Sequence, residues 1–170
     1  IQRPTGGGFG GPAQLTSNQK GAYGWNQALK SDVNAYKLFS ADDAKAKPMR
    51  EAGFGTVLTH QRDGIVRGTG AVVTLSGEKD NFAIVKEKAA ALYSFSKGSS
   101  TQSYPSSLMG SIALLRQTYN DAAWYKNNPE AAAKEGFNIT LKYFNSNQTL
   151  PQIFDVQDRG VDLWNIMRAD

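Results

Sequence analysis

A helix-like stretch, a glycine turn and a short apolar run follow one another between residues 40 and 60, and this order constrains the fold most. Ser40 is a suitable N-cap, and the acidic residues that come soon after it suit the positive end of a helix dipole. Pro48 would interrupt this helix or mark the start of its last part. Gly53-Phe54-Gly55 would end it, and residues 56–60 are typical of a buried strand. Helix, glycine turn and buried strand form the repeating unit of a parallel sheet, so the sequence predicts an α/β fold.

The part of the chain that follows is rich in β-forming side chains and has little helix in it. Residues 64–75 are rich in β-branched side chains and are bracketed by glycine. Residues 82–85 and 91–95 are two further short apolar runs. Because strands without helices between them usually pair as antiparallel neighbours, we expect an inserted antiparallel β segment here. Residues 151–156 predict one more strand.

Apolar side chains recur with helical spacing in two regions. The first is residues 25–38, where one helical face would carry Trp25, Leu29, Val33 and Tyr36. The second and clearer one starts after Pro105, ends before Pro129 and carries Leu108, Ile112, Leu115, Tyr119 and Ala122 on one face. Further helices are expected over 130–136, over 138–146 and after Asp158.

Composition excludes several classes of protein. The 170 residues suffice for one modest core, and no apolar run approaches the length of about 20 residues that spans a bilayer. The chain has no cysteine, which excludes disulfides, thiolate nucleophiles and cysteine-based zinc sites. The net charge is +4, but the lysines of the basic N-terminal third are spread singly rather than clustered. We therefore expect no nucleic-acid partner and no membrane partner.

The two ends of the chain predict that it is an internal piece of a longer protein. It begins at Ile1 without an initiator methionine or a signal-peptide pattern, and it stops at Asp170 without a glycine or proline after the last helical run. Residues 1–24 open with five glycines and two prolines among the first twelve positions, which predicts a flexible connection. The glycines match a nucleotide-binding spacing formally, but no strand precedes them.

Four segments of the chain resemble large exported bacterial proteins of the amidohydrolase superfamily, in the imidazolonepropionase-like group. The resemblance covers nearly the whole chain and depends on the order of the segments, because no single motif is diagnostic. The segments are Tyr23 to Lys30, Gly53 to Val73, Met109 to Gln117, and Leu150 to Met167.

The resemblance implies a (β/α)8 barrel joined to a small β-sandwich, with one or two divalent metals at the carboxyl ends of the strands. Such a metal, typically zinc, lowers the pKa of a bound water, so that hydroxide attacks an amide-type carbon. The family's ligands are a His-x-His on the first strand, a Lys or Glu on the fourth, His on the fifth and sixth and Asp on the eighth. This chain has no His-x-His, and the strand that should deliver a metal histidine has Asp155 and Gln157 instead. We therefore expect residues 25–170 to form a partial (β/α)8 barrel with an inserted β segment, and zinc to require the parent protein.

Four residues are candidates for a functional site. His60, the only histidine, follows a predicted parallel strand and would contact substrate or metal, or else hydrogen-bond at the strand–loop junction. Asp63 is a second catalytic candidate, although Asp-Gly is also a common turn. Arg67 would bind a substrate carboxylate or phosphate, or pair with Asp63 or Glu51. Asp155 is the candidate metal ligand.

Three hypotheses follow for the function. The first is a fragment, inactive by itself, of a metal-dependent hydrolase that opens non-peptide C–N bonds of a small, cyclic amide-type substrate. The second is a non-catalytic barrel used for binding or assembly, and the third is a self-contained α/β binding module. In the first two, the partner is the remainder of the parent polypeptide. Open sheet edges would also favour self-association, and the resemblance implies a periplasmic or extracellular location.

Overall fold

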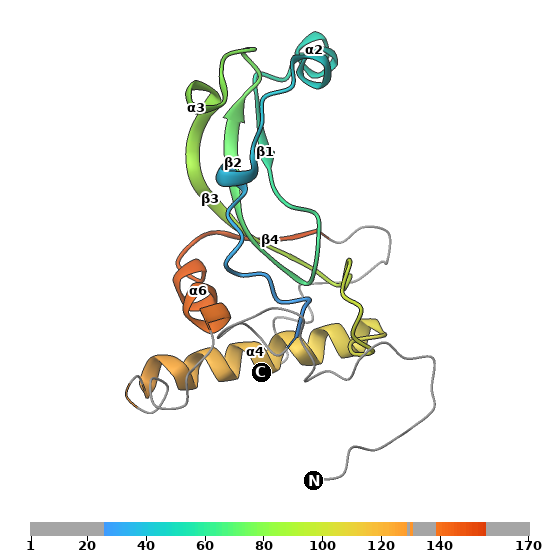
Figure 1. Cartoon of the computed structure of the whole chain (residues 1–170), viewed down its shortest axis with the longest axis vertical. Helices are drawn as coiled ribbons and strands as arrows, with labels where there is room; N and C mark the ends of the chain where they lie inside the picture. The colour runs from blue at the N-terminus through green and yellow to red at the C-terminus, as the bar shows by residue number, and fades with distance from the viewer. Residues whose placement is uncertain (1–25, 129, 131–138, 156–170) are drawn as a thin grey trace.

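The computed structural model describes residues 26–128, 130 and 139–155, and its centre is one curled sheet of four strands in the order β1-β2-β3-β4 (Figure 1). The strands are β1 (Thr56–Thr59), β2 (Val66–Thr74), β3 (Ile84–Ser94) and β4 (Gln152–Asp155). β2 is antiparallel to both β1 and β3, whereas β4 is parallel to β3. β1, β3 and β4 therefore run in one direction, and β2 is inserted between them in the opposite one. This mixed α/β sheet resembles part of a barrel wall.

The predicted strand over 56–60 is present, but its predicted setting was wrong. β1 lies at an edge of the sheet, its side chains are exposed or half-buried, and its neighbour β2 is antiparallel. The predicted antiparallel β segment is confirmed. However, the runs 82–85 and 91–95 are not two separate strands: β3 is continuous from Ile84, and Phe82 lies in the short helix α3 (Asp80–Ala83). The polar residues between the two runs concealed this continuity, because they remain solvent-exposed within the strand.

The predicted helix over residues 25–38 is wrong for most of its length. Only α1 (Ala35–Leu38) is helical, and residues 28–34 follow β2 through backbone hydrogen bonds. Lys30 N–H donates to Val66 O at 2.8 Å, and Thr69 N–H donates to Val33 O at 3.0 Å. Hydrogen bonds to a distant strand outweighed the local helical spacing, which is a weak preference.

Residues 31–34 are also tied to the C-terminal part of the described chain. The Ser31 hydroxyl donates to Thr140 O at 2.6 Å, and Asn147 Nδ2 donates to Ser31 O at 2.8 Å. Both contacts are buried, so they fix the position of this segment.

The helix predicted after Ser40 is confirmed, with its start shifted. It is α2 (Asp43–Glu51), and its N-cap is Asp42, whose side chain accepts from Lys45 N–H. Pro48 lies inside the helix without interrupting it. No residue of α2 is buried.

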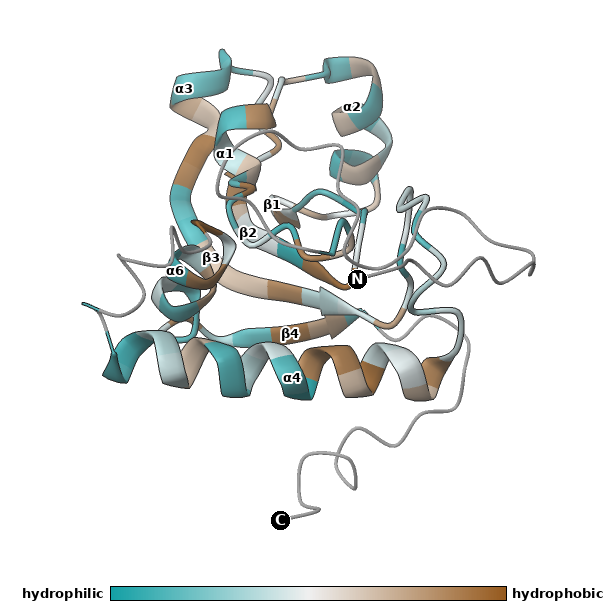
Figure 2. Cartoon of the chain, turned by 60° about the horizontal axis from the view of Figure 1, so that its bottom comes forward, coloured by the Kyte–Doolittle hydropathy of each residue, from teal (hydrophilic) through white to brown (hydrophobic). Residues whose placement is uncertain are grey.

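Two helices cover one face of the sheet, and both were predicted. They are α4 (Leu108–Asn127), capped by Ser107, and α6 (Ile139–Asn147). The N-terminal half of α4 is the more apolar half, as its colouring in Figure 2 shows. Their apolar faces meet the sheet in a core that contains Ala28, Leu29, Ile65, Val66, Ala91, Tyr93, Leu114, Leu115, Ala122, Leu141 and Phe144.

The strand predicted over 151–156 is confirmed as β4, next to β3. The flexible connection predicted for residues 1–24 and the helix after Asp158 lie outside the described residues, as does nearly all of the helix predicted over 130–136. Among the helices that the structure describes, none is both long and apolar enough to cross a membrane.

Candidate functional site

The carboxyl ends of β3 and β4 lie at the same end of the sheet, and the connection from β1 to β2 passes along this end. Ser94, the last residue of β3, is the register partner of Asp155, the last residue of β4. Val66, which begins β2, pairs with Tyr93. The loops 60–65 and 95–104 therefore meet at this end of the strands, and we call the region that they form the strand-end site. The chain brings its largest group of interacting charged side chains together there among the described residues.

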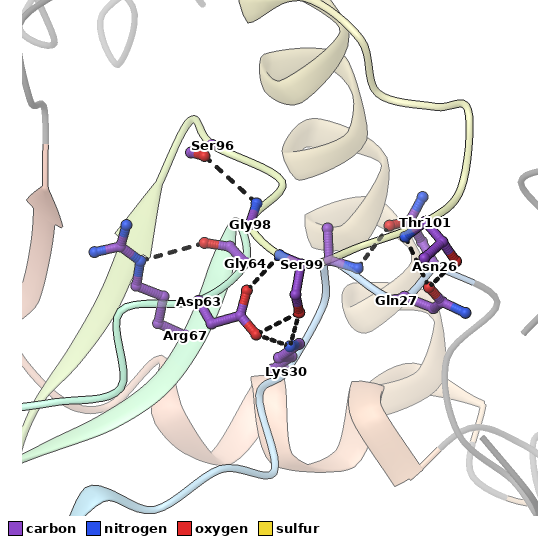
Figure 3. A network of polar contacts seen from close by, with 11 residues as sticks. Asn26, Gln27, Lys30, Asp63, Gly64, Arg67, Ser96, Gly98, Ser99 and Thr101 are labelled. Atoms are coloured by element: carbon purple, nitrogen blue, oxygen red, sulfur yellow. Dashed lines mark hydrogen bonds and ion pairs between the residues drawn. The ribbon is translucent and has the colours of Figure 1, made fainter. Parts of the chain in front are cut away.

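Asp63 is the centre of one half of the strand-end site (Figure 3). Its carboxylate accepts hydrogen bonds from Lys30 Nζ, from Ser99 N–H at 2.7 Å and from the Ser99 hydroxyl at 2.7 Å. Partial burial raises the pKa of Asp63, but the hydrogen bonds from Lys30 and Ser99 outweigh it and bring the pKa down to about 2. Asp63 is therefore a fixed anion rather than a proton-transfer group at neutral pH.

Glycine at position 98 makes this arrangement possible. Gly98 has φ of +60°, and a Cβ there would lie 2.0 Å from Asp63 Oδ1 and 2.5 Å from Gly64 N. The 95–104 loop can approach the Asp63 carboxylate this closely only because position 98 has no side chain.

Arg67 and Asp155 form the other half of the strand-end site. Arg67 Nη1 lies 2.5 Å from Asp155 Oδ2, and Arg67 Nε donates to Gly64 O at 3.3 Å. The Arg67 side chain is only 7% exposed. Its hydrogen bond lowers the pKa of Asp155, with smaller contributions from Arg62 and His60. The pairing of Arg67 with Asp63 or Glu51 that the sequence suggested is wrong, because Asp155 arrives from a strand that is distant in sequence.

His60 begins the 60–65 loop but has no direct contact with either charged half of the strand-end site. Its Nδ1 is 3.1 Å from Gln61 O, and the residue lines a cavity between β1 and the segment that joins α1 to α2. The structure thus brings Arg67 and Asp155 into contact. Asp63 lies near them, because the next residue, Gly64, accepts a hydrogen bond from Arg67. His60 contacts none of the three.

Several residues of the strand-end site were missed in the sequence. Lys30 was assigned to a helix that does not form, and Ser99 lies in a loop between the run 91–95 and Pro105 to which no function was assigned from the sequence. A second set of contacts ties the same loop to the start of the described chain: Thr101 N–H and hydroxyl both donate to Gln27 Oε1 at 3.2 Å, and Gln27 N–H donates to Gln102 Oε1 at 2.7 Å. The one available signal was the density of hydroxyl and amide side chains after a strand.

The described residues do not fit a metal centre. No group of three or more His, Cys, Asp or Glu side chains lies close enough to hold a metal among residues 26–128, 130 and 139–155. Asp155, the ligand candidate, already has a guanidinium partner. Nothing at the strand-end site therefore provides the donor set that catalytic zinc needs.

Comparisons with known proteins add a structural neighbour. No family model matches the chain, and no curated protein matches it. The chain is similar to the crystal structure of an amidohydrolase from Thermotoga maritima MSB8, with a TM-score of 0.62 and 21% sequence identity. The match covers 83% of this chain and 40% of that one. The fold is amidohydrolase-like. The chain accordingly spans less than half the length of this amidohydrolase.

The Arg67–Asp155 pair should act as a unit in folding. We expect Arg67→Met to lower the free energy of unfolding by about 2–3 kcal/mol, because it leaves a half-buried carboxylate with only the longer contact to Arg62, at 3.9 Å. Arg67→Met combined with Asp155→Leu should recover at least about 1 kcal/mol of that loss, since no unpaired charge remains. Urea unfolding of the four proteins of this double-mutant cycle measures the coupling. Strictly additive losses would show that the two side chains do not interact in solution.

Asp63 predicts a dependence of stability on acid pH. The pKa of Asp63 is about 2 in the folded chain and 3.8 for an unperturbed aspartate, so folding favours its ionised form. Its contribution is present above about pH 4 and is lost as the pH falls towards 2. We expect Asp63→Asn to cost about 1 kcal/mol at pH 7, less than the pKa shift alone implies because Lys30 and Ser99 are partly exposed to solvent.

As the pH falls from about 4 to 2, the stabilities of Asp63→Asn and the unmodified chain should approach each other, and most of the difference should be gone at pH 2. The measurement is thermal unfolding between pH 2 and 7, with Glu87→Gln on the exposed part of β3 as the control. A constant difference between Asp63→Asn and the unmodified chain across this range would contradict the assignment.

Proposed function

We propose that this chain is part of a metal-dependent hydrolase of the amidohydrolase type that acts on non-peptide C–N bonds, with a small cyclic amide as substrate. The observation that carries the proposal is the likeness of the fold to an amidohydrolase over 83% of the chain. In this proposal the parallel pair β3 and β4 belongs to a (β/α)8 barrel, and the antiparallel strands β1 and β2 belong to the inserted β segment. The strand-end site, at the carboxyl ends of β3 and β4, faces the catalytic centre, where such barrels keep their chemistry. The motif resemblance to imidazolonepropionase-like proteins supports that subgroup and an exported location.

Within such a barrel, this chain would contribute a shaped wall rather than the reacting groups. The Asp63 network and the Arg67–Asp155 pair hold the 60–65 and 95–104 loops in fixed positions. The zinc ion would be held by other parts of the parent polypeptide, because the described residues offer no group of ligands for it. The chain in isolation is then expected to hydrolyse nothing.

A non-catalytic barrel is the second candidate, and the Arg67–Asp155 pair favours it. In this candidate the carboxylate at the end of β4 has exchanged metal binding for an ion pair with a buried guanidinium. The barrel would then survive as a scaffold whose surface serves binding or assembly.

One experiment distinguishes the two candidates. The longest natural polypeptide that contains this chain is purified without chelators, its metal content is measured by mass spectrometry, and ring opening is followed on a panel of five- and six-membered cyclic amides. The hydrolase proposal expects stoichiometric zinc and activity that disappears on chelation and returns with zinc. A folded protein without metal and without ring opening would exclude the hydrolase and support the scaffold.

A further inference from the structure

A cavity of about 570 Å³ lies against β1, and neither the Asp63 network nor the Arg67–Asp155 pair lines it. The sheet side of the cavity is formed by Val57, Val73 and Leu75, and the opposite side is formed by Leu38, Ala46 and Met49. Leu38 and Met49 are 63% and 46% exposed although they are apolar. The cavity has the size of a specific binding site.

The cavity borders an unpaired strand edge. β1 is the first strand of the sheet, so one side of its backbone has no partner among the described residues. Gly55 O accepts from Leu75 N–H, so the alternation of an antiparallel pair directs the N–H and C=O groups of Thr56 and Leu58 away from β2. The side chains of Val57 and Thr59 point into the cavity. A strand added beside β1 would therefore place every second side chain on the cavity face.

The rim of the cavity is acidic, in contrast to the rest of the molecule. Four carboxylates and two lysines line it: Asp42, Asp43, Glu78, Asp80, Lys45 and Lys79. With His60 neutral, the lining has a net charge of −2 (four negative and two positive), whereas the whole chain has +4. Asp42 is paired with Lys45 and Asp43 with Arg50, so Glu78 and Asp80 are the lining carboxylates without an ion-pair partner among the described residues. Two copies of this edge facing each other would bring two acidic rims together, so like-charge repulsion opposes a symmetric dimer here.

We propose that β1 and this cavity bind an extended peptide segment that is basic and apolar in alternation. The segment joins the sheet as a fifth strand beside β1. Its backbone pairs with Thr56 and Leu58, its apolar side chains enter the cavity, and its lysines or arginines lie against the acidic rim. Strand addition of this kind takes affinity from main-chain hydrogen bonds and specificity from pockets for alternate side chains. The inference is independent of any catalytic role.

The test uses the full 170-residue chain and a fluorescent peptide of alternating valine and lysine as the probe. We expect saturable binding by fluorescence anisotropy at low salt, together with slower amide exchange at Thr56 and Leu58. Thr56→Pro removes an outward N–H at the first residue of an edge strand, where proline is tolerated, and should weaken binding about tenfold or more. Ala46→Phe, which fills the cavity, should weaken it similarly. Ala44→Phe, on α2 but outside the cavity, is the matched control and should bind as the unmodified chain does.

Charge is tested separately. Glu78→Lys should lower the affinity for the valine–lysine peptide several-fold, and a valine–glutamate peptide should not bind. Circular dichroism and thermal unfolding of each variant verify that it is folded. The proposal is overturned if the valine–lysine peptide does not bind, if a peptide of the same composition with its valines adjacent binds equally well, or if Thr56→Pro has no effect. A concentration-dependent dimer in sedimentation that Thr56→Pro abolishes would identify a second copy as the occupant and would also overturn it.

Discussion

Gly68→Ala is expected to lower the free energy of unfolding by about 3–5 kcal/mol, a large share of the total stability of a domain of this size. Gly68 has φ of +80°, and a Cβ there would lie 2.0 Å from Val33 O and 3.0 Å from Lys30 O. Both neighbours are backbone atoms of residues 30–33, which lie alongside β2, so they cannot turn away as a side chain would. An alanine must therefore displace that segment, and Lys30 would move with it.

Two other glycines separate the causes of this loss. Gly53 also has a positive φ, of +94°, but a Cβ there would meet nothing within 4 Å, so Gly53→Ala should cost only about 1–2 kcal/mol. Gly55 has no such φ and open space around it, so Gly55→Ala should change stability by less than about 0.5 kcal/mol. Urea unfolding of the three variants gives the comparison. Equal losses for Gly68→Ala and Gly53→Ala would mean that the 30–33 segment does not lie against β2.

Phe144→Ala is expected to cost about 3–5 kcal/mol, because it removes a large side chain from a closely packed core. Phe144 is 0% exposed and makes edge-to-face contacts with Tyr119 at 4.9 Å and Tyr93 at 6.2 Å between ring centroids. It is the side chain of α6 that joins this helix to both α4 and β3.

Tyr143→Ala is the matched control. Tyr143 is the preceding residue of the same helix and is 39% exposed, so its removal should cost less than about 1 kcal/mol. Urea unfolding and near-ultraviolet circular dichroism would report the two changes. A loss below about 1.5 kcal/mol for Phe144→Ala would show that α6 is not docked as described.

The parts of the fold that the sequence predicts well are those decided by local pattern. α4 has apolar residues at regular helical spacing and a serine cap, and its length and position are as predicted. β2 and β4 are short apolar segments between clear breaks, and both are present. In α4, side-chain periodicity and burial agree, because the buried residues recur at helical spacing.

The parts that the sequence predicts badly are those decided by distant partners. Residues 28–34 have a helical pattern, but their backbone groups bond to β2 instead. β1 was expected in a parallel sheet, but the chain turns back directly into β2, which pairs with β1 as an antiparallel neighbour. No local pattern encodes this pairing. Arg67 and Asp155 were both identified as candidates, but their contact joins residues 88 positions apart and could not be anticipated without the sheet.

The candidate site shows the same division. Asp63 was identified as a candidate three residues beyond His60, after a predicted strand, but its Lys30 partner lies in the segment whose conformation was predicted wrongly. Ser99 was not identified, because it lies in a loop with several serines and no sequence pattern distinguishes it from the others. Sequence reasoning therefore found the residues that end strands and missed those that the tertiary fold brings to them.

The two hydrogen bonds of Ser31 make the integrity of the strand-end site depend on a helix that contributes no side chain to it. α6 holds Ser31 through Thr140 and Asn147, and Lys30 is the residue next to Ser31. A stop codon between α4 and α6 would remove both hydrogen bonds of Ser31 and weaken the hold on Lys30 beside Asp63, although every residue that contacts Asp63 would still be made. A shortened version of the chain meant to preserve the Asp63 half of the site must extend through residue 147, and one meant to preserve both halves must include Asp155.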